Sequence, residues 1–315
     1  MAREKGVDIL ALGEPLVEFS AEQEGSLESV ESFRPGFGGD ASNFAVAASR
    51  AGARVGMVAR IGKDRFGDGL MALWEREGVN AEHVLRGGGP TGVYFISREE
   101  GRHEFTYYRS GSAASRMTPE LLPADAIREA GVLHVTGITQ GISDSSCDAA
   151  FAAMDIARQA GTLVSYDPNY RPALWSAQRA AGIIKESVSR ADFVFPSLEE
   201  TELLFGICDP EDAIDRYLGL GAKKVILKLG KDGAIFADGG GLVRVSPMRV
   251  RVVDSSGAGD TLAGAFVAAY MENRSPEACT RFAVAASGLS TTGVGCVRPM
   301  PGREDILRRM APDTL

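Results

Sequence analysis

Residue types that build metal and disulfide sites are scarce in this sequence. Its 315 residues include four cysteines and three histidines. The cysteines are scattered without a C-x-x-C pair, which favours free buried thiols over disulfides or a zinc site. No H-E-x-x-H spacing brings the histidines together, so we expect no transition metal held by protein side chains.

Long apolar runs and a surplus of basic residues are also lacking. No run approaches the roughly 20 apolar residues that span a bilayer, and Val7–Leu12 is too short for a secretory signal. We therefore expect a cytoplasmic protein without a membrane partner. The net charge of −8 disfavours nucleic acid as a partner, although local arginines can still bind an anionic ligand.

Three common motifs of α/β enzymes are missing. There is no G-x-x-x-x-G-K-[ST], which argues against a P-loop enzyme. No G-x-G-x-x-G follows the first predicted strand, which argues against a dinucleotide-dependent oxidoreductase. No G-x-S-x-G elbow occurs, which argues against an α/β-hydrolase.

The sequence does contain a repeated alternation of short apolar runs and longer helical patterns. This alternation predicts a mainly parallel sheet with helices on both faces. The predicted strands are Val7–Leu12, Val55–Ile61, Val132–Thr136, Leu163–Tyr166, Phe193–Phe195, Val225–Lys228 and Ala234–Ala237. The predicted helices are Ala41–Ala51, Phe66–Glu77, Ser143–Ala160, Glu199–Phe205, Pro210–Leu218, Thr261–Met271 and Pro276–Thr291.

Two segments depart from this rhythm. Val17–Phe33 and Thr91–Tyr108 alternate with period two, and a turn at 99–102 interrupts the second. Two such excursions from an α/β body predict a small sheet at one edge, placed to act as a lid.

The segment Asp254–Asp260 carries the strongest chemical signal. It contains a Gly-Ala-Gly loop, follows the predicted strand Val250–Val253 and opens onto a helix of small residues. Glycines at a helix N-terminus let N–H groups converge on one point, where the helix dipole also favours an anion. Asp260 is placed to take a proton from an attacking hydroxyl. The alternative is a glycine turn with Asp260 as an ordinary N-cap.

Asp254–Asp260 resembles the C-terminal signature of the ribokinase-like (PfkB) carbohydrate kinase family. The family's N-terminal signature is similar to Phe37–Val46, and a further family motif is similar to Ile61–Gly67. The resemblance runs from about Asp8 to Leu307.

The resemblance implies a Rossmann-like three-layer α/β/α body with a small β-sheet lid. Residues 1–315 would form a single kinase domain, with the lid at about 15–36 and 90–112. ATP and Mg²⁺ would be co-substrates. Some family members also bind a monovalent cation such as K⁺, to which Asp254 and Ser256 would contribute here.

The resemblance also implies roles for single residues. Asp260 would be the catalytic base, and the N–H groups of Gly257, Ala258 and Gly259 would form the anion hole. Gly38, Gly39 and Asn43 would lie at the sugar site. Gly38 and Gly39 are also compatible with a simple tight turn before a helix.

The nucleotide site is matched less evenly. Lys228–Gly233 resembles the family's nucleotide loop, so Lys228, Gly230 and Gly233 would contact ATP together with Gly257 and Gly259; the same stretch could be a hairpin turn. The family's Asn-x-x-Glu motif is matched with Ser197 in place of Asn. Glu200 would hold a hydrated Mg²⁺, although a helix dipole alone also favours Glu there. Near the adenine site, Val284 stands where the family often has Asn, which leaves the nucleotide preference open.

Two segments around Tyr107–Arg109 and Asn169–Arg171 resemble the 2-keto-3-deoxygluconate kinases. Arg109 and Arg171 would bind the substrate carboxylate, since an arginine fork matches it bidentately. Tyr94, Tyr107 and Asn169 would contact the sugar, besides Asp260. The product would be 2-keto-3-deoxy-6-phosphogluconate.

Other interpretations stay open. The tyrosines could be ordinary lid packing, and Arg109 could pair with Glu104. Fructokinases and 5-dehydro-2-deoxygluconokinases carry related segments. Glu18 stands where many neutral-sugar kinases place an Asp, which speaks against a sugar acid. A non-catalytic sugar-binding homologue is the alternative of another class. The lid, with Val93 and Phe95, could form a homo-oligomer.

Overall fold

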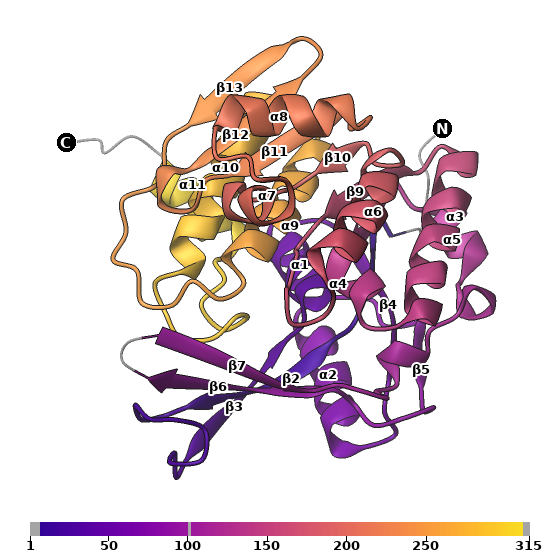
Figure 1. Ribbon diagram of the computed structural model, residues 1–315, viewed down its shortest axis with the longest axis vertical. Helices are drawn as coiled ribbons and strands as arrows, with labels where there is room; N and C mark the ends of the chain where they lie inside the picture. The colour runs from indigo at the N-terminus through magenta and orange to yellow at the C-terminus, as the bar shows by residue number, and fades with distance from the viewer. Residues whose placement is uncertain (1–6, 100–101, 311–315) are drawn as a thin grey trace.

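The computed structural model describes residues 7–99 and 102–310. It contains a large sheet flanked by helices and a smaller sheet, drawn at the bottom of Figure 1. Residues 100 and 101, within the turn expected at 99–102, lie outside the described residues.

The large sheet has nine strands in the order β13-β12-β11-β10-β9-β8-β1-β4-β5. Strands β5 to β11 in this order run parallel, and β12 and β13 form an antiparallel edge. The central strands are buried along their whole length, as expected for a parallel sheet covered on both faces. The strands are β1 (Ile9–Leu12), β4 (Val55–Ile61), β5 (Val84–Arg86), β8 (Val132–Thr136), β9 (Leu163–Asp167), β10 (Phe193–Val194), β11 (Lys224–Lys228), β12 (Ala234–Asp238) and β13 (Gly241–Val245).

Helices cover both faces of this sheet, which confirms the predicted three-layer α/β/α body (Figure 1). One core contains Phe44, Trp74 and Phe266, and the other contains Met154 and Tyr217. The first face carries α1 (Asp40–Arg50), α2 (Arg65–Arg76), α9 (Ala258–Met271), α10 (Pro276–Ser290) and α11 (Arg303–Met310). The second carries α3 (Ala124–Glu129), α4 (Gly137–Gly141), α5 (Asp144–Ala160), α6 (Ala177–Val188), α7 (Leu198–Phe205) and α8 (Pro210–Gly219).

The smaller sheet, called the lid sheet below, has the strand order β3-β2-β6-β7. Its outer pairs are antiparallel, whereas β2 and β6 run parallel at its centre. Its strands are β2 (Leu16–Ala21), β3 (Phe33–Gly38), β6 (Val93–Glu99) and β7 (Arg102–Tyr108). Strand β3 continues beyond the predicted limit at residue 36, and its last residue lies directly beside the start of α1.

Two predictions around the glycine loop are wrong. Val250–Val253 is not a strand. Its backbone instead bonds to the end of α10, where Val253 N donates to Thr291 O at 2.8 Å, so this contact overrides the strand propensity of the valines. Helix α9 begins at Ala258 rather than Thr261, so Asp260 lies inside its first turn.

Candidate active site

The predicted site residues gather at the carboxyl ends of the parallel strands. Asn169 follows β9, Ser197 follows β10, and Lys228 ends β11. The N-terminus of α9 lies at the same edge, because Lys228 Nζ reaches Gly259. Open parallel sheets bind their ligands at this edge.

The N-terminus of helix α9 has the geometry of an anion site. Gly257 is its N-cap, with a left-handed φ of 73° that favours glycine. The first N–H groups of a helix lack intrahelical acceptors and carry partial positive charge. The N–H of Ala258 donates to Ser255 O at 3.2 Å, so of the three predicted anion-hole amides this one is already engaged.

Asp260 is half-buried in the first turn of α9. Asn43 Nδ2, from α1, donates to Asp260 Oδ2 at 2.8 Å. Burial and the charge of Asp40 raise the pKa of Asp260 to about 7, against the opposing effects of Asn43 and Lys228. A carboxylate with this pKa is suited to act as a general base near neutral pH.

Asp40 lies within the family motif Phe37–Val46, but no role was predicted for it. The carboxylate of Asp40 is buried at the start of α1, where it accepts from Ala41 N at 2.8 Å and from Asn169 Nδ2 at 3.3 Å. Burial and neighbouring Asp167 raise the pKa of Asp40. Its place directly after Gly38-Gly39, at the start of a predicted helix, is the sequence feature that could have identified it.

Lys228 links the two ends of the site. Its Nζ donates to Asp167 Oδ2 at 2.7 Å and lies 3.4 Å from the position that a Cβ on Gly259 would occupy. Burial lowers the pKa of Lys228, but the charges of Asp167 and Glu200 outweigh it and raise the pKa overall. The ammonium therefore stays charged beside the first turn of α9.

Arg109 forms a buried ion pair with Glu14. Its Nη2 donates to Glu14 Oε2, and Ser112 Oγ donates to the other Glu14 oxygen at 2.9 Å. The partner is thus Glu14, not Glu104. The buried Nε of Arg109 has no hydrogen-bond partner among the described residues.

Arg171 lies opposite, in the loop after β9. Its Nη1 is 3.8 Å from Glu200 Oε1, and about half of its side chain is exposed. Burial lowers the pKa of Arg171, but the negative charges of Glu200 and Asp260 outweigh this effect, so the pKa is raised overall. Of the two predicted arginines, Arg171 is the more accessible.

The predicted tyrosines line the inner face of the lid sheet. Tyr94 on β6 and Tyr107 on β7 are paired across the strands, with ring centres 5.5 Å apart. The Tyr94 hydroxyl donates to Glu18 and packs against Gly38, where a Cβ would lie only 2.3 Å from it. Gly38 therefore has to be glycine, but Tyr94 is also lid packing, as the alternative interpretation expected.

The predicted nucleotide residues form local structure. Ser197 is the N-cap of α7: Glu200 N donates to Ser197 Oγ at 3.1 Å, and Ser197 N donates to Glu200 Oε2 at 3.3 Å. Gly230 and Gly233, with φ of 57° and 89°, turn β11 into the antiparallel β12. The hairpin-turn interpretation is confirmed, and the nucleotide contacts remain a prediction.

Asp254 and Ser256, predicted for a monovalent cation, form a tight turn. Asp254 Oδ1 accepts from Ser256 N and Oδ2 from Gly295 N, both at 2.9 Å. Within residues 7–99 and 102–310, no three His, Cys, Asp or Glu side chains are grouped to hold a metal ion. The cation sites remain predictions.

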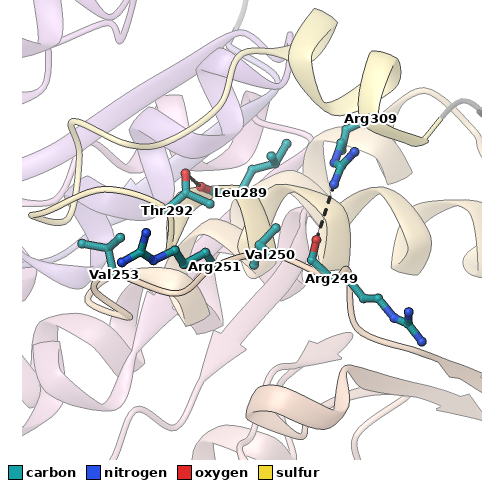
Figure 2. A pocket seen from close by; sticks show the side chains of 7 residues that line it. All are labelled: Arg249, Val250, Arg251, Val253, Leu289, Thr292 and Arg309. Carbon is teal, nitrogen blue, oxygen red and sulfur yellow. Dashed lines mark hydrogen bonds between the residues drawn. The ribbon is translucent and has the colours of Figure 1, made fainter.

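A cavity of about 750 Å³ lies apart from these residues, between the segment that precedes Asp254 and helices α10 and α11 (Figure 2). It is lined by Arg249, Val250, Arg251, Val253, Leu289, Thr292 and Arg309. It includes none of the predicted site residues.

In the described part of the chain, no helix has the length and apolarity to cross a membrane.

Comparison with known proteins identifies relatives over nearly the whole chain. The 2-dehydro-3-deoxygluconokinase of Thermoproteus tenax is 38% identical over 290 residues, covering 90% of this chain and 88% of the relative. The same enzyme of Bacillus subtilis (strain 168) is 36% identical over 95% of this chain and 94% of the relative. The probable fructokinase-4 of Arabidopsis thaliana is 32% identical, with 95% of each chain covered.

The crystal structure of a PfkB protein from Polaromonas sp. JS666 matches 96% of this chain and 99% of its own, with 32% identity and a TM-score of 0.87. The family model described as pfkB family carbohydrate kinase matches residues 7–303. The chain belongs to the pfkB family of carbohydrate kinases.

Proposed function

We propose that this kinase transfers the γ-phosphoryl group of ATP to the terminal hydroxyl of 2-keto-3-deoxygluconate, the compound also called 2-dehydro-3-deoxygluconate. The product is 2-keto-3-deoxy-6-phosphogluconate. The observation that carries the proposal is a pair of buried atoms without partners among the described residues, Asn43 Oδ1 and Arg109 Nε. Ser97 Oγ and Trp175 Nε1 are also buried without partners among the described residues. Asn43 and Arg109 differ from them because Asp40 acts electrostatically on both Arg109 and the Asn43 partner Asp260. Buried polar atoms are nearly always hydrogen-bonded, so a polar ligand bound around Asp40 would satisfy both atoms.

The sugar acid fits between these groups. Arg171, accessible and positively charged, binds the carboxylate, and Arg109 Nε adds a second donor. Asn43 Oδ1 accepts from a sugar hydroxyl, and Asn169 offers an amide to the others. Because Arg109 is already neutralised by Glu14, the net positive charge for an acid comes mainly from Arg171.

At the other end, Asp260 accepts the proton of the attacking hydroxyl while the first-turn amides of α9 stabilise the transferred group. Glu200, buried beside Lys228 and Arg171, fits the second-sphere position that a hydrated Mg²⁺ requires. Bound Mg²⁺ would supply charge neutralisation between the phosphates. A K⁺ ion would sit at Asp254 and Ser256.

Two features favour other functions. Glu18, buried on β2, favours a neutral sugar such as fructose, and 5-dehydro-2-deoxygluconate is a further acid of similar shape. Ser197 and Val284 depart from the family pattern and favour a sugar-binding homologue without turnover. The intact Asp260–Asn43 pair supports catalysis.

We also propose a single cytoplasmic domain that assembles through its lid sheet. The outer face of the lid carries an aromatic cluster, in which Phe95 contacts Phe19, Phe33 and Tyr108 with ring centres 5.1 to 5.8 Å apart. Tyr108 is 63% exposed. A second copy of the chain would cover this face.

A substrate panel with ATP and Mg²⁺ tests the proposal. It includes 2-keto-3-deoxygluconate, its galactonate epimer, 5-dehydro-2-deoxygluconate, fructose and ribose, with ADP release and sugar phosphate both measured. We expect the highest kcat/KM for 2-keto-3-deoxygluconate. Rapid turnover of fructose and none of the acids would overturn the substrate, and no turnover at all would favour the sugar-binding homologue.

A further inference from the structure

A buried polar cluster joins the lid sheet to the loop that follows helix α10. Glu18 on β2 accepts hydrogen bonds from the Tyr94 hydroxyl and from Ser20 Oγ, the latter at 2.7 Å. The thiol of Cys296, in the loop, donates to Glu18 Oε2 at 3.4 Å and lies 3.6 Å from the Tyr94 oxygen. Glu18, Tyr94 and Cys296 are 3%, 4% and 6% exposed, so the cluster is closed to bulk water.

The same cysteine packs against the N-cap of helix α9. A Cβ built on Gly257 would lie 3.3 Å from the Cys296 Cβ and 3.5 Å from the Cys296 carbonyl oxygen. The loop is tied to the glycine segment on its other side as well, because Gly295 N donates to Asp254 Oδ2 at 2.9 Å. Cys296 is therefore in contact with the lid on one side and with the anion-binding turn on the other.

The charge states suit this arrangement. Burial, with the neighbouring Glu18 carboxylate, raises the pKa of the Cys296 thiol well above its usual value. Burial likewise raises the pKa of Tyr94. Both groups therefore remain protonated near neutral pH and donate to Glu18, and charge-assisted hydrogen bonds of this kind are the stronger ones.

We propose that Cys296 is a positioning residue that couples the lid sheet to the first turn of helix α9. The inference rests on the phosphoryl-transfer function proposed above. With the coupling intact, a closed lid fixes Gly257 and its neighbouring amides against the transferred phosphoryl group. Without it, the lid and the anion-binding turn move independently, and water reaches the site as a competing acceptor.

The test compares Cys296→Ala with Cys279→Ala. Cys279 is a matched control, since its thiol is fully buried in α10 and donates to the Arg274 carbonyl at 3.6 Å, away from the lid sheet and the glycine segment. We expect Cys296→Ala to lower kcat about 10-fold and to release more ADP than sugar phosphate. Cys279→Ala should change kcat by less than about twofold, and Cys296→Ser, which keeps a donor, should recover most of the coupling.

A second readout needs no turnover. In the protein without ligands, the backbone amides of β6 should exchange hydrogen faster in Cys296→Ala and in Glu18→Gln than in the wild type or Cys279→Ala. Equal exchange in all four proteins, or equal ADP and sugar phosphate from Cys296→Ala, would overturn the coupling. If Cys296→Ala does not fold, Glu18→Gln gives the same decision, because it alters the same cluster from the lid side. Failure of the wild type in the substrate panel would contradict the proposed function and leave the exchange result standing.

Discussion

The proposed sugar side and the proposed nucleotide side of the site differ in the groups that form them. On the proposed sugar side, buried carboxylates have polar partners, Arg109 for Glu14 and Asn169 for Asp40, and two buried atoms have no partner among the described residues. On the proposed nucleotide side, the predicted residues are mainly a helix cap and glycine turns, and Lys228, paired with Asp167, is the charged exception. Buried charges are costly unless each has a partner, so we expect the sugar side to accept only ligands whose polar groups match its fixed donors and acceptors. On the nucleotide side we expect backbone groups to make most contacts, so changes of side chain should matter less.

The largest expected effect lies where the two sides meet. Asp260→Asn should lower kcat about 10²-fold or more, because the general base is removed, while the affinity for ATP stays nearly unchanged. Steady-state kinetics and calorimetric ATP titration measure the two quantities. Turnover close to the wild-type value would remove Asp260 from the mechanism.

Next comes the sugar side. Arg171→Ala should raise KM for the sugar acid about 10- to 100-fold, because the main free positive charge for the carboxylate is lost. Arg171→Lys should recover part of the affinity for the sugar acid. In both variants KM for ATP should stay unchanged. Arg179→Ala, on the surface of α6 and paired with Asp144, is the control for loss of an arginine. An equal rise in KM for a neutral sugar would contradict the carboxylate contact.

A smaller effect is expected in the pH profile. Burial and the Asp40 charge raise the pKa of Asp260 to about 7, and only the deprotonated form is a base, so kcat/KM should rise with pH through about 7 and then level off. Asp40→Asn removes a negative charge, which lowers the pKa of Asp260 and should move the midpoint to lower pH by about one unit. Measurements of kcat/KM between pH 5 and 9 for the wild type and Asp40→Asn test this shift. An unchanged or raised midpoint would show that Asp40 does not act on the base.

The smallest effect belongs to the nucleotide side. Ser197→Ala removes the N-cap of α7 and should lower the free energy of unfolding by about 1 kcal/mol, while KM for ATP changes by less than about threefold. Denaturant unfolding and kinetics separate the two. A rise in KM for ATP above tenfold, with stability unchanged, would make Ser197 a nucleotide ligand and would weaken the contrast between the two sides.

The fold was predictable where the periodicity was strong. Val55–Ile61 and Val132–Thr136 are strands with the predicted bounds, because buried parallel strands are nearly continuous apolar runs. The helices α3, α4, α6 and α11 were missed. In α6 the signal was present, because the buried residues Ala180, Ile184 and Val188 recur every four residues. Val250–Val253 had strand propensity but bonded to the end of α10.

The glycine loop and Asp260 were singled out from the sequence pattern, but the other site residues were proposed only from the family resemblance. Asn43 and Asp260 are in contact across a separation of 217 residues, which no local pattern reveals. Glu14 and Asp167 were missed as partners of Arg109 and Lys228, although each stands at or just after the carboxyl end of a buried strand. That position, rather than any motif, was the signal for them.

The parallel pairing of β2 with β6 has a consequence for synthesis of the chain. The two strands are separated in sequence by β3, α1, β4, α2 and β5, so they pair only after a long loop has closed. We expect the β2–β3 hairpin, with Phe19 and Phe33, to leave the ribosome well before its partner β6. Until β6 and β7 follow, the β2 edge of this hairpin is unpaired and its aromatic side chains are uncovered, so the nascent chain is open to aggregation there.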